Sequence, residues 1–290
     1  VAGWIDLCLV HRLALTLLEY GVGEQSGFIV VTGEVGSGKT TLVRRLLGIV
    51  GDDVNVGLIT NTHESFGELM RWVMLAYGIE QRSEDRVECY RAFVDFLVDQ
   101  YSNNKRTVLI VDEAQNLSSE ALEELRMLSN VNADRYFLLQ LILIGQPELR
   151  DKLRSPALRQ FVQRISIHYH LDALTLEDTV GYIRHRLAVV GGDPELIDDL
   201  ACVAVHHYTF GVPRLINVLC DLALVYAYAE DKARVDTDLV LDVVAARQGT
   251  GLEVFRPDPP NVSRREIKAQ LSEVLSGESE PTRLVSGAAS

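Results

Sequence analysis

The sequence predicts an α/β fold, with helices on both faces of a parallel β-sheet in three layers, followed by a small all-helical domain. As far as Leu171, short apolar runs typical of buried strands alternate with segments that have helical apolar spacing. Beyond Leu171 only helical patterns follow. A glycine-rich turn joins the first strand to its helix. Buried strands that alternate with helices favour a parallel sheet covered on both faces.

The first part of the chain contains strands and helices in alternation. Gly21 and Gly23 end the first helix, and Ser118 is a suitable N-cap for a later one, with Glu120 in its first turn. The expected elements are a helix at 9–20, a strand at 28–32, a helix containing 42–47, a strand at 54–60, helices at 65–77 and 85–100, a strand at 107–111, a helix at about 119–129, a strand at 137–144, a helix near 147–153 and a last strand at 165–171.

A phosphate-binding pattern lies between the first strand and its helix. It reads Gly33-x-x-x-x-Gly38-Lys39-Thr40, in the strand–turn–helix context that such a loop needs. Its glycines let backbone N–H groups converge on an anion at the positive end of the helix. Lys39 can then reach the β- and γ-phosphates, and the Thr40 hydroxyl can bind Mg²⁺. A chance glycine-rich turn is the alternative, which the ordered combination disfavours. The expected nucleotide-binding residues are Gly33, Glu34, Val35, Gly36, Ser37, Gly38, Lys39, Thr40 and Thr41.

The second part of the chain is helical. Thr175-Leu176-Glu177-Asp178 resembles a capping box, and further helices are expected at 195–207, 213–228 and 237–247. From about Gly249 the composition turns to Pro, Ser, Glu and Arg, which is typical of a disordered tail with one short helix at 264–275. The expected divisions are an N-terminal helical segment (1–26), a nucleotide-binding core (27–172), a helical lid domain (173–248) and a polar tail (249–290).

Two acidic residues end the apolar strand at 107–111. A carboxylate at the end of a buried strand is costly unless it faces a ligand, so Asp112 is expected to hold Mg²⁺ together with Thr40. Glu113 is then the natural general base for the water that attacks the γ-phosphorus. The alternative is that both carboxylates only cap the next helix.

Gln146 follows another buried strand and should reach the same edge of the sheet, where ligands of open α/β folds bind. We expect it to contact the γ-phosphate or the attacking water. The alternative is a turn residue that only precedes Pro147.

Three arginines are candidates for contact with phosphate. Arg159 and Arg164 precede the last strand, and either could project into the nucleotide site of a neighbouring subunit as an arginine finger. An ordinary surface salt bridge is an equal alternative for each of them. Arg214 follows Pro213 at the start of a lid helix and could reach the γ-phosphate, which would couple nucleotide state to lid closure. The alternative for Arg214 is a structural ion pair.

Composition limits the location and the partners. The net charge of −13 argues against bulk attraction to nucleic acid or anionic membranes. No apolar run approaches the ~18 residues of a membrane span. Four scattered cysteines without a C-x-x-C pair indicate free thiols in a reducing compartment, and residues 1–10 lack a signal-peptide pattern. We therefore expect a cytoplasmic protein.

The sequence resembles the bacterial AAA+ ATPases of the ExeA/GspA secretion type, in particular those associated with exosortase and exopolysaccharide gene clusters. The resemblance covers about residues 11–230. The segments that carry it are His11-x-x-Ala14-Leu15-x-x-Leu18-x-Tyr20-Gly21, 32–41 around the phosphate loop, Val111-Asp112-Glu113-Ala114-Gln115-Asn116-Leu117, 122–130, Gly145-Gln146-Pro147-Glu148-Leu149, Gln163-Arg164-Ile165, Tyr182-Ile183-Arg184-His185-Arg186-Leu187 and Gly211-Val212-Pro213-Arg214-Leu215-Ile216-Asn217.

This resemblance implies a P-loop NTPase core of the AAA+/ASCE class with a helical lid, ATP and Mg²⁺ as cofactors, and Arg214 as a second sensor. It also implies assembly with other copies into a ring or filament, and partners in envelope secretion or polysaccharide export. Through these partners the protein would lie at the periphery of the inner membrane. A more distant likeness to transposition regulators of the TniB/TnsC kind makes DNA an alternative partner, which the acidic charge disfavours. The family's usual amino-terminal stretch is not found in residues 1–10, and the wall-binding and membrane segments of some members are not carried over.

Overall fold

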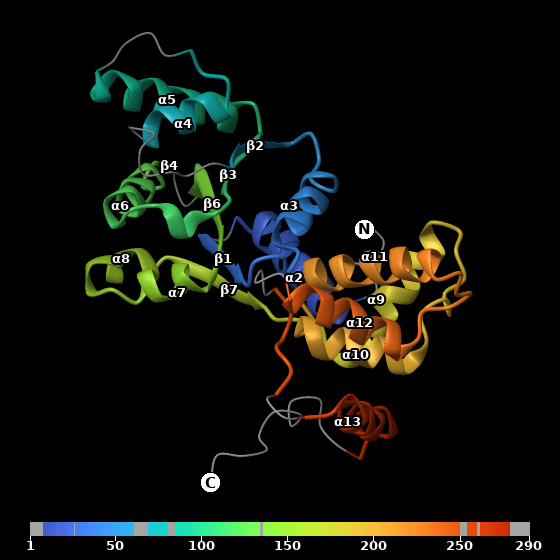
Figure 1. Cartoon of the computed structure of the whole chain (residues 1–290). Coiled ribbons are helices and arrows are strands. Elements are labelled where there is room, and N and C mark those ends of the chain that lie inside the picture. The colour runs from blue at the N-terminus through green and yellow to red at the C-terminus, as the bar shows by residue number, and fades with distance from the viewer. Residues whose placement is uncertain are drawn as a thin grey trace.

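A computed structural model describes residues 8–25, 27–60, 69–80, 85–133, 136–249, 254–259 and 262–278. It shows an α/β core beside an all-helical lid (Figure 1). The core sheet has five parallel strands in the order β2-β3-β6-β1-β7. Their bounds are β1 (Phe28–Gly33), β2 (Val54–Ile59), β3 (Arg106–Val111), β6 (Leu139–Gly145) and β7 (Ile165–Leu171). The predicted fold class is confirmed.

Alternate residues of the central strands pack against helices on opposite faces of the sheet. In β1, Ile29 and Val31 face α2 (Leu9–Gly23) and α3 (Lys39–Leu47). Phe28 and Val30 face the other layer. That layer comprises α4 (Leu69–Ala76), α5 (Arg86–Ser102), α6 (Ser119–Leu128), α7 (Pro147–Leu153) and α8 (Arg159–Val162). This period-2 alternation between two apolar faces explains why the strands read as unbroken apolar runs.

Short elements connect the main ones. Two 3₁₀ turns, η2 (Ala114–Asn116) and η3 (Pro156–Leu158), follow β3 and α7. The strand expected at 137–144 is divided, because β5 (Tyr136–Phe137) pairs antiparallel with β4 (Asn132–Ala133) before β6 begins. As expected, the Ser118 side chain caps α6 by accepting a hydrogen bond from the Ala121 backbone N–H at 3.1 Å.

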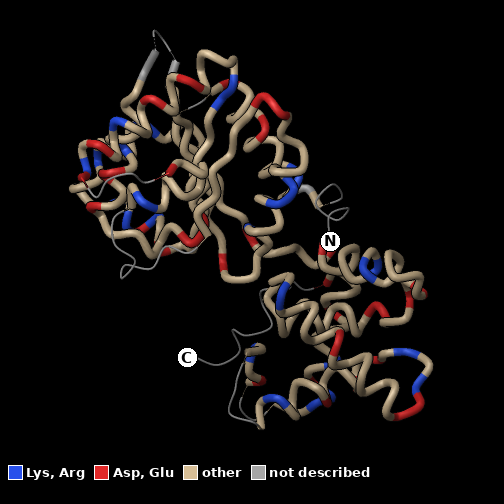
Figure 2. Tube along the Cα trace, turned by 90° about the horizontal axis from the view of Figure 1, so that it is seen from above, with Lys and Arg blue, Asp and Glu red and all other residues tan. Residues whose placement is uncertain are grey.

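The lid contains α9 (Leu176–Val189), α10 (Asp199–Thr209), α11 (Pro213–Ala229) and α12 (Thr237–Gln248) around a separate apolar core. Tyr208, Leu219 and Val240 lie at its centre and are fully buried. The Thr175 hydroxyl caps α9 by accepting a hydrogen bond from the Asp178 N–H at 3.1 Å. No helix in the part of the chain that the structure describes is long and apolar enough to cross a membrane. Acidic and basic residues are interspersed over both bodies (Figure 2).

The chain after α12 contains the short helix that the sequence predicts at 264–275. Residues 264–276 form α13 (Arg264–Ser276), which begins at a capping box between Ser263 and Glu266. Its apolar residues Ile267, Leu271 and Val274 recur at helical spacing and pack into the lid core, which outweighs the polar composition. Residues 1–7 and 279–290, and the start of the helix expected at 65–77, lie outside the described residues.

A strap formed by residues 254–259 ties α10 to the chain before α13. The Arg256 N–H donates to the Tyr208 carbonyl at 2.9 Å, and the Tyr208 hydroxyl donates to Asp258 at 2.6 Å. The Arg256 guanidinium lies 4.3 Å from the centre of the Phe210 ring. Phe255 is buried beside these contacts. The strap therefore holds the end of α10 that leads into α11.

Candidate nucleotide-binding site

The loop between β1 and α3 has a backbone that two neighbouring segments approach closely. Gly36 and Gly38 have φ angles of +83° and +104°, a region that side-chain-bearing residues rarely adopt. A Cβ at Gly38 would lie 2.8 Å from Nε2 of His11 on α2, and a Cβ at Gly36 would lie 2.5 Å from the Cβ of Arg214 on the lid. Glycine is therefore needed at both positions for the conformation and for the contacts.

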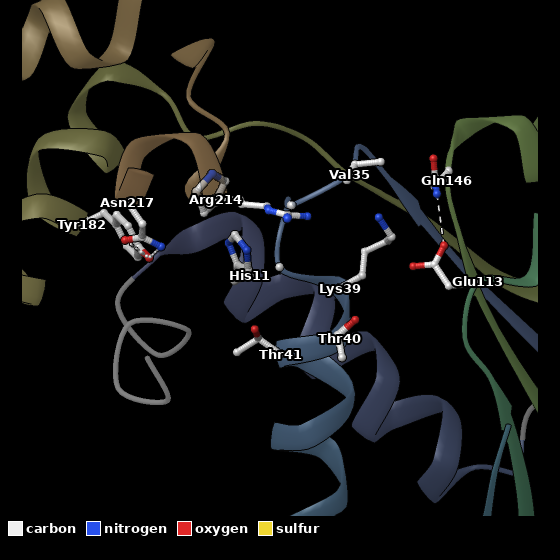
Figure 3. A pocket seen from close by; sticks show the side chains of 13 residues that line it. His11, Val35, Lys39, Thr40, Thr41, Glu113, Gln146, Tyr182, Arg214 and Asn217 are labelled. Atoms are coloured by element: carbon white, nitrogen blue, oxygen red, sulfur yellow. Dashed lines mark hydrogen bonds between the residues drawn. The ribbon is translucent and has the colours of Figure 1, made fainter. Parts of the chain in front are cut away.

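A cavity of about 420 Å³ opens over this loop, between the core and the lid (Figure 3). This volume lies within the range of small-molecule and cofactor sites. The cavity is lined by His11, Val35, Gly36, Gly38, Lys39, Thr40, Thr41, Glu113, Gln146, Tyr182, Pro213, Arg214 and Asn217. Predicted residues from the loop, from two strand ends and from the lid thus surround one space.

The Lys39 side chain is buried beside the loop. Its ammonium group donates hydrogen bonds to the carbonyl oxygens of Gly33 and Glu34, at 2.7 and 2.8 Å. Burial lowers the pKa of Lys39, and the carboxylates of Glu113 and Asp112 partly offset this effect. The positive charge is consequently held where the loop's backbone would meet an anion.

Thr40 and Asp112 meet below the cavity. The Thr40 hydroxyl donates to Oδ2 of Asp112 at 3.1 Å, and Oδ1 of Asp112 accepts the Glu113 N–H at 2.9 Å. Asp112 is only 5% exposed, so its charge is kept from water by the fold. Hydroxyl and carboxylate oxygens are the ligands that Mg²⁺ prefers. This pair therefore fits the magnesium ion that the sequence predicts.

Glu113 and Gln146 also lie together, as the position of each after an apolar strand predicts. The Gln146 side-chain amide donates to Oε2 of Glu113 at 3.1 Å (Figure 3). Gln115 donates to the same oxygen at 2.6 Å and accepts the Gln146 backbone N–H at 2.9 Å. Partial burial raises the pKa of Glu113, but the hydrogen bonds from both amides and the charge of Lys39 outweigh it, and the pKa is lowered overall. Glu113 is thus held as a carboxylate.

The lid contributes Arg214 directly. The Arg214 backbone N–H donates to the Gly36 carbonyl at 3.3 Å, and its side chain extends from α11 toward the phosphate loop (Figure 3). Tyr182 on α9 and Asn217 on α11 form a hydrogen bond of 3.0 Å at the lid side of the cavity. The structure therefore places Arg214 beside the loop.

His11 joins α2 to the phosphate loop. Its Nε2 lies 2.8 Å from the Ser37 carbonyl, and its Nδ1 lies 3.4 Å from the Cys8 sulfur. A carbonyl can only accept, so Nε2 carries the hydrogen. Burial lowers the pKa of His11, which favours the neutral ring with Nδ1 as an acceptor for the Cys8 thiol.

Arg159 and Arg164 are not brought to this cavity. Arg164 lies just before β7, and its guanidinium donates to the Ser129 hydroxyl at 3.1 Å. Phe28 pairs with Ile165 and Gly33 with Leu171, so Arg164 sits at the opposite edge of the sheet from the loop. A seven-residue strand at about 3.3 Å per residue separates the two edges by about 20 Å. Arg159 is exposed on α8, near the same edge.

The sequence interpretation missed four residues of this site: His11, Gln115, Tyr182 and Asn217. All four stand in segments that carry the family resemblance. No spacing rule connects them to the phosphate loop, because their contacts arise only from tertiary structure.

Comparisons with known proteins agree with this geometry. The AAA domain family matches residues 22–153. General secretion pathway protein A of Aeromonas hydrophila is 38% identical over 226 residues, which are 78% of this chain and 41% of that protein. The chain thus spans less than half the length of this curated relative.

Solved structures share the fold at low identity. Cdc6p from Pyrobaculum aerophilum superposes with a TM-score of 0.61 at 17% identity, over 77% of this chain and 63% of that chain. ORC2 from Aeropyrum pernix, solved as ADPNP-ADP complexes, gives 0.55 at 16% identity, over 81% of this chain and 66% of that chain. A single-residue variant of RuvB from Thermotoga maritima gives 0.52 at 19% identity, over 81% of this chain and 67% of that chain.

Proposed function

We propose that this chain, which is similar to General secretion pathway protein A, is an AAA+ ATPase that binds Mg²⁺-bound ATP between the phosphate loop and the lid and hydrolyses it to ADP and phosphate. The observation that carries the proposal is the hydrogen bond between Thr40 and Asp112 beside the buried Lys39, in a cavity that also contains Glu113. A hydroxyl, two carboxylates and an ammonium group converge there on the amino end of α3.

Each group has a part in phosphoryl transfer. The backbone N–H groups of the loop and Lys39 bind the phosphates, and Thr40 with Asp112 would hold the magnesium ion. When bound, that ion neutralises charge on the β- and γ-phosphate oxygens. Glu113 accepts the proton of the attacking water, and Gln146, whose amide already contacts Glu113, orients the water or the γ-phosphate.

The lid responds to the nucleotide through Arg214. Its backbone contact with Gly36 joins α11 to the phosphate loop, and its side chain extends toward the same loop. A γ-phosphate at this position attracts the guanidinium and holds the lid against the core. Loss of that phosphate removes the attraction, so hydrolysis changes the lid position.

The protein assembles with other copies, so that one subunit completes the site of the next. This proposal is supported by the position of Arg164 and Arg159 near the sheet edge about 20 Å from their own phosphate loop, too far for either to serve the nucleotide of its own subunit. The relative's printed name further supports a role in a secretion pathway, and we extend this to an envelope secretion or polysaccharide-export assembly that the ATPase contacts from the cytoplasm.

Two variants test the proposed reaction. Lys39→Ala should lose Mg²⁺-dependent binding of a fluorescent ATP analogue, whereas Glu113→Gln should bind it normally and turn over about 10² to 10⁴ times more slowly, the range that general-base catalysis supplies. Asn116→Ala is a control from the same turn as Glu113, and its side chain is exposed. ATP binding that is unchanged by Lys39→Ala, in a correctly folded protein, would contradict the proposal.

A further inference from the structure

We propose that Gln115 is the positioning residue of the general base: it sets the orientation of the Glu113 carboxylate and ties that carboxylate to Gln146. The inference rests on the proposed function, because it takes Glu113 as the base for ATP hydrolysis. Gln115 does not line the nucleotide cavity, so it acts through Glu113 and Gln146.

The three residues form a closed ring of hydrogen bonds, which includes the backbone N–H of Gln146. Gln115 Nε2 donates to Oε2 of Glu113 at 2.6 Å, and Gln146 Nε2 donates to the same oxygen at 3.1 Å. Gln115 Oε1 accepts the Gln146 backbone N–H at 2.9 Å, which closes the ring. Of the two side-chain hydrogen bonds that Glu113 accepts within this ring, the one from Gln115 is the shorter. The Gln115 side-chain amide contacts both Glu113 and Gln146.

Gln115 is itself held on both sides. The Lys152 ammonium on α7 donates to the Gln115 carbonyl at 2.7 Å and to the Leu117 carbonyl at 2.5 Å, which fixes the turn η2. On the other side, a Cβ at Gly145 would lie 2.9 Å from Gln115 Oε1. The strand β6 therefore ends in a glycine where the Gln115 amide needs the space.

The backbone of Glu113 gives a second, independent indication. Glu113 has a φ angle of +54°, a left-handed conformation that is strained for a non-glycine residue. Such a conformation persists only where the surroundings determine it. Here the Asp112 carboxylate accepts the Glu113 N–H, and the Gln115 amide holds the Glu113 side chain. These two contacts maintain the strained backbone, which places the Glu113 carboxylate at the cavity.

For catalysis, Gln115 would hold the Glu113 carboxylate in the position that it needs as the general base. Without Gln115, the Glu113 carboxylate loses its shorter side-chain bond and can rotate about its last torsion. A misplacement of about 1 Å costs about 10²-fold in rate, so Gln115→Ala should lower kcat roughly 10- to 100-fold. Because Gln115 lies outside the cavity, KM for ATP and the affinity for a fluorescent ATP analogue should change by less than about 2-fold.

A second variant keeps the shape of the side chain. Gln115→Glu retains an acceptor toward the Gln146 N–H but places a carboxylate 2.6 Å from Oε2 of Glu113, where the amide donated. Like charges at this distance repel, so this variant should lower kcat at least as much as the alanine variant. Asn116→Ala, with an exposed side chain in the same turn, should keep the wild-type kcat and is the matched control.

The decisive experiment is a double-mutant cycle on kcat, measured by single-turnover hydrolysis, with Glu113→Gln as the second change. If Gln115 acts through Glu113, Gln115→Ala should have less than about a 2-fold effect in the Glu113→Gln background. An equal loss in both backgrounds would overturn the proposal, because it would show a general structural role. A Gln115→Ala variant with wild-type kcat and melting temperature would overturn it as well.

The role of Glu113 as the base and the role of Gln115 can be contradicted independently. If Glu113→Gln hydrolyses ATP at the wild-type rate, the proposed function loses its base. If Glu113→Gln is slow while both Gln115 variants are as fast as Asn116→Ala, only the role of Gln115 is wrong.

Discussion

Gly36→Ala probes the contact between the lid and the phosphate loop. At φ +83° an alanine costs about 1 to 2 kcal/mol of backbone strain, wherever the lid lies. Its Cβ would also lie 2.5 Å from the Cβ of Arg214, whereas two carbon atoms prefer about 3.5 to 4.0 Å. The lid must therefore retreat by about 1 Å from its present position.

The retreat of the lid has a cost in free energy, which comes mainly from one hydrogen bond. It breaks the hydrogen bond from the Arg214 N–H to the Gly36 carbonyl, a bond of 3.3 Å worth about 0.5 to 1.5 kcal/mol. If ATP binds with the lid against the loop, the affinity for ATP should fall about 3- to 10-fold. The backbone strain should appear separately, as a loss of about 1 to 2 kcal/mol in the free energy of unfolding.

The assay is calorimetric titration with a non-hydrolysable ATP analogue, with urea unfolding in parallel. Gly191→Ala is the matched control, because Gly191 has a φ angle of +78° and a Cβ there would meet nothing within 4 Å. Both variants should lose the stability that backbone strain costs, Gly36→Ala should lose somewhat more because its lid contact is also broken, and only Gly36→Ala should lose affinity. Wild-type affinity in a folded Gly36→Ala protein would refute the view that the lid contacts the loop in the bound state.

Three further predictions follow from the site and the lid. Thr40→Ala removes one magnesium-binding oxygen, so half-maximal hydrolysis should need a Mg²⁺ concentration about 10-fold higher or more, and an unchanged Mg²⁺ titration would contradict this role. Specific ATPase activity should rise with protein concentration and should be lowered by Arg164→Ala or Arg159→Ala, whereas a flat profile would indicate a self-sufficient monomer. Burial and the charge of Arg256 lower the pKa of His206 and His207 to about 4, against about 6.5 in the unfolded chain. Between pH 6.5 and pH 4 the unfolded state therefore binds more protons than the folded state. The free energy of unfolding should fall as the pH falls through this range, by about 1.4 kcal/mol per pH unit for each histidine. Equal urea midpoints at pH 7 and pH 5 would contradict this assignment.

The core of the site could be predicted because parallel strands end at a common edge. Asp112, Glu113 and Gln146 each follow an apolar run directly, so a simple count of residues places them together. The phosphate loop is equally local, since its glycines, lysine and threonine are contiguous. Here the order along the chain and the position in space carry the same information.

The remaining features depend on tertiary contacts. His11 precedes Ser37 of the loop by 26 residues and reaches it only because α2 packs on the sheet. Gln115 is one polar residue among several after β3, and only the arrival of Gln146 gives it a partner. The short helix at 264–275 could be predicted, but the burial of three of its apolar residues in the lid core could not, because it depends on how the lid helices are arranged. Composition averages over residues, and burial depends on a few of them.

The strand order has a consequence for biosynthesis. β1 pairs with β6 and β7, whose residues lie more than a hundred positions later in the chain. A ribosome that adds about 5 to 20 residues per second needs several seconds or more to supply either neighbour. During that interval the apolar segment 28–33 has neither of its native partners, so a nascent chain is most open to chaperones, and to aggregation, just where it will later hold its nucleotide.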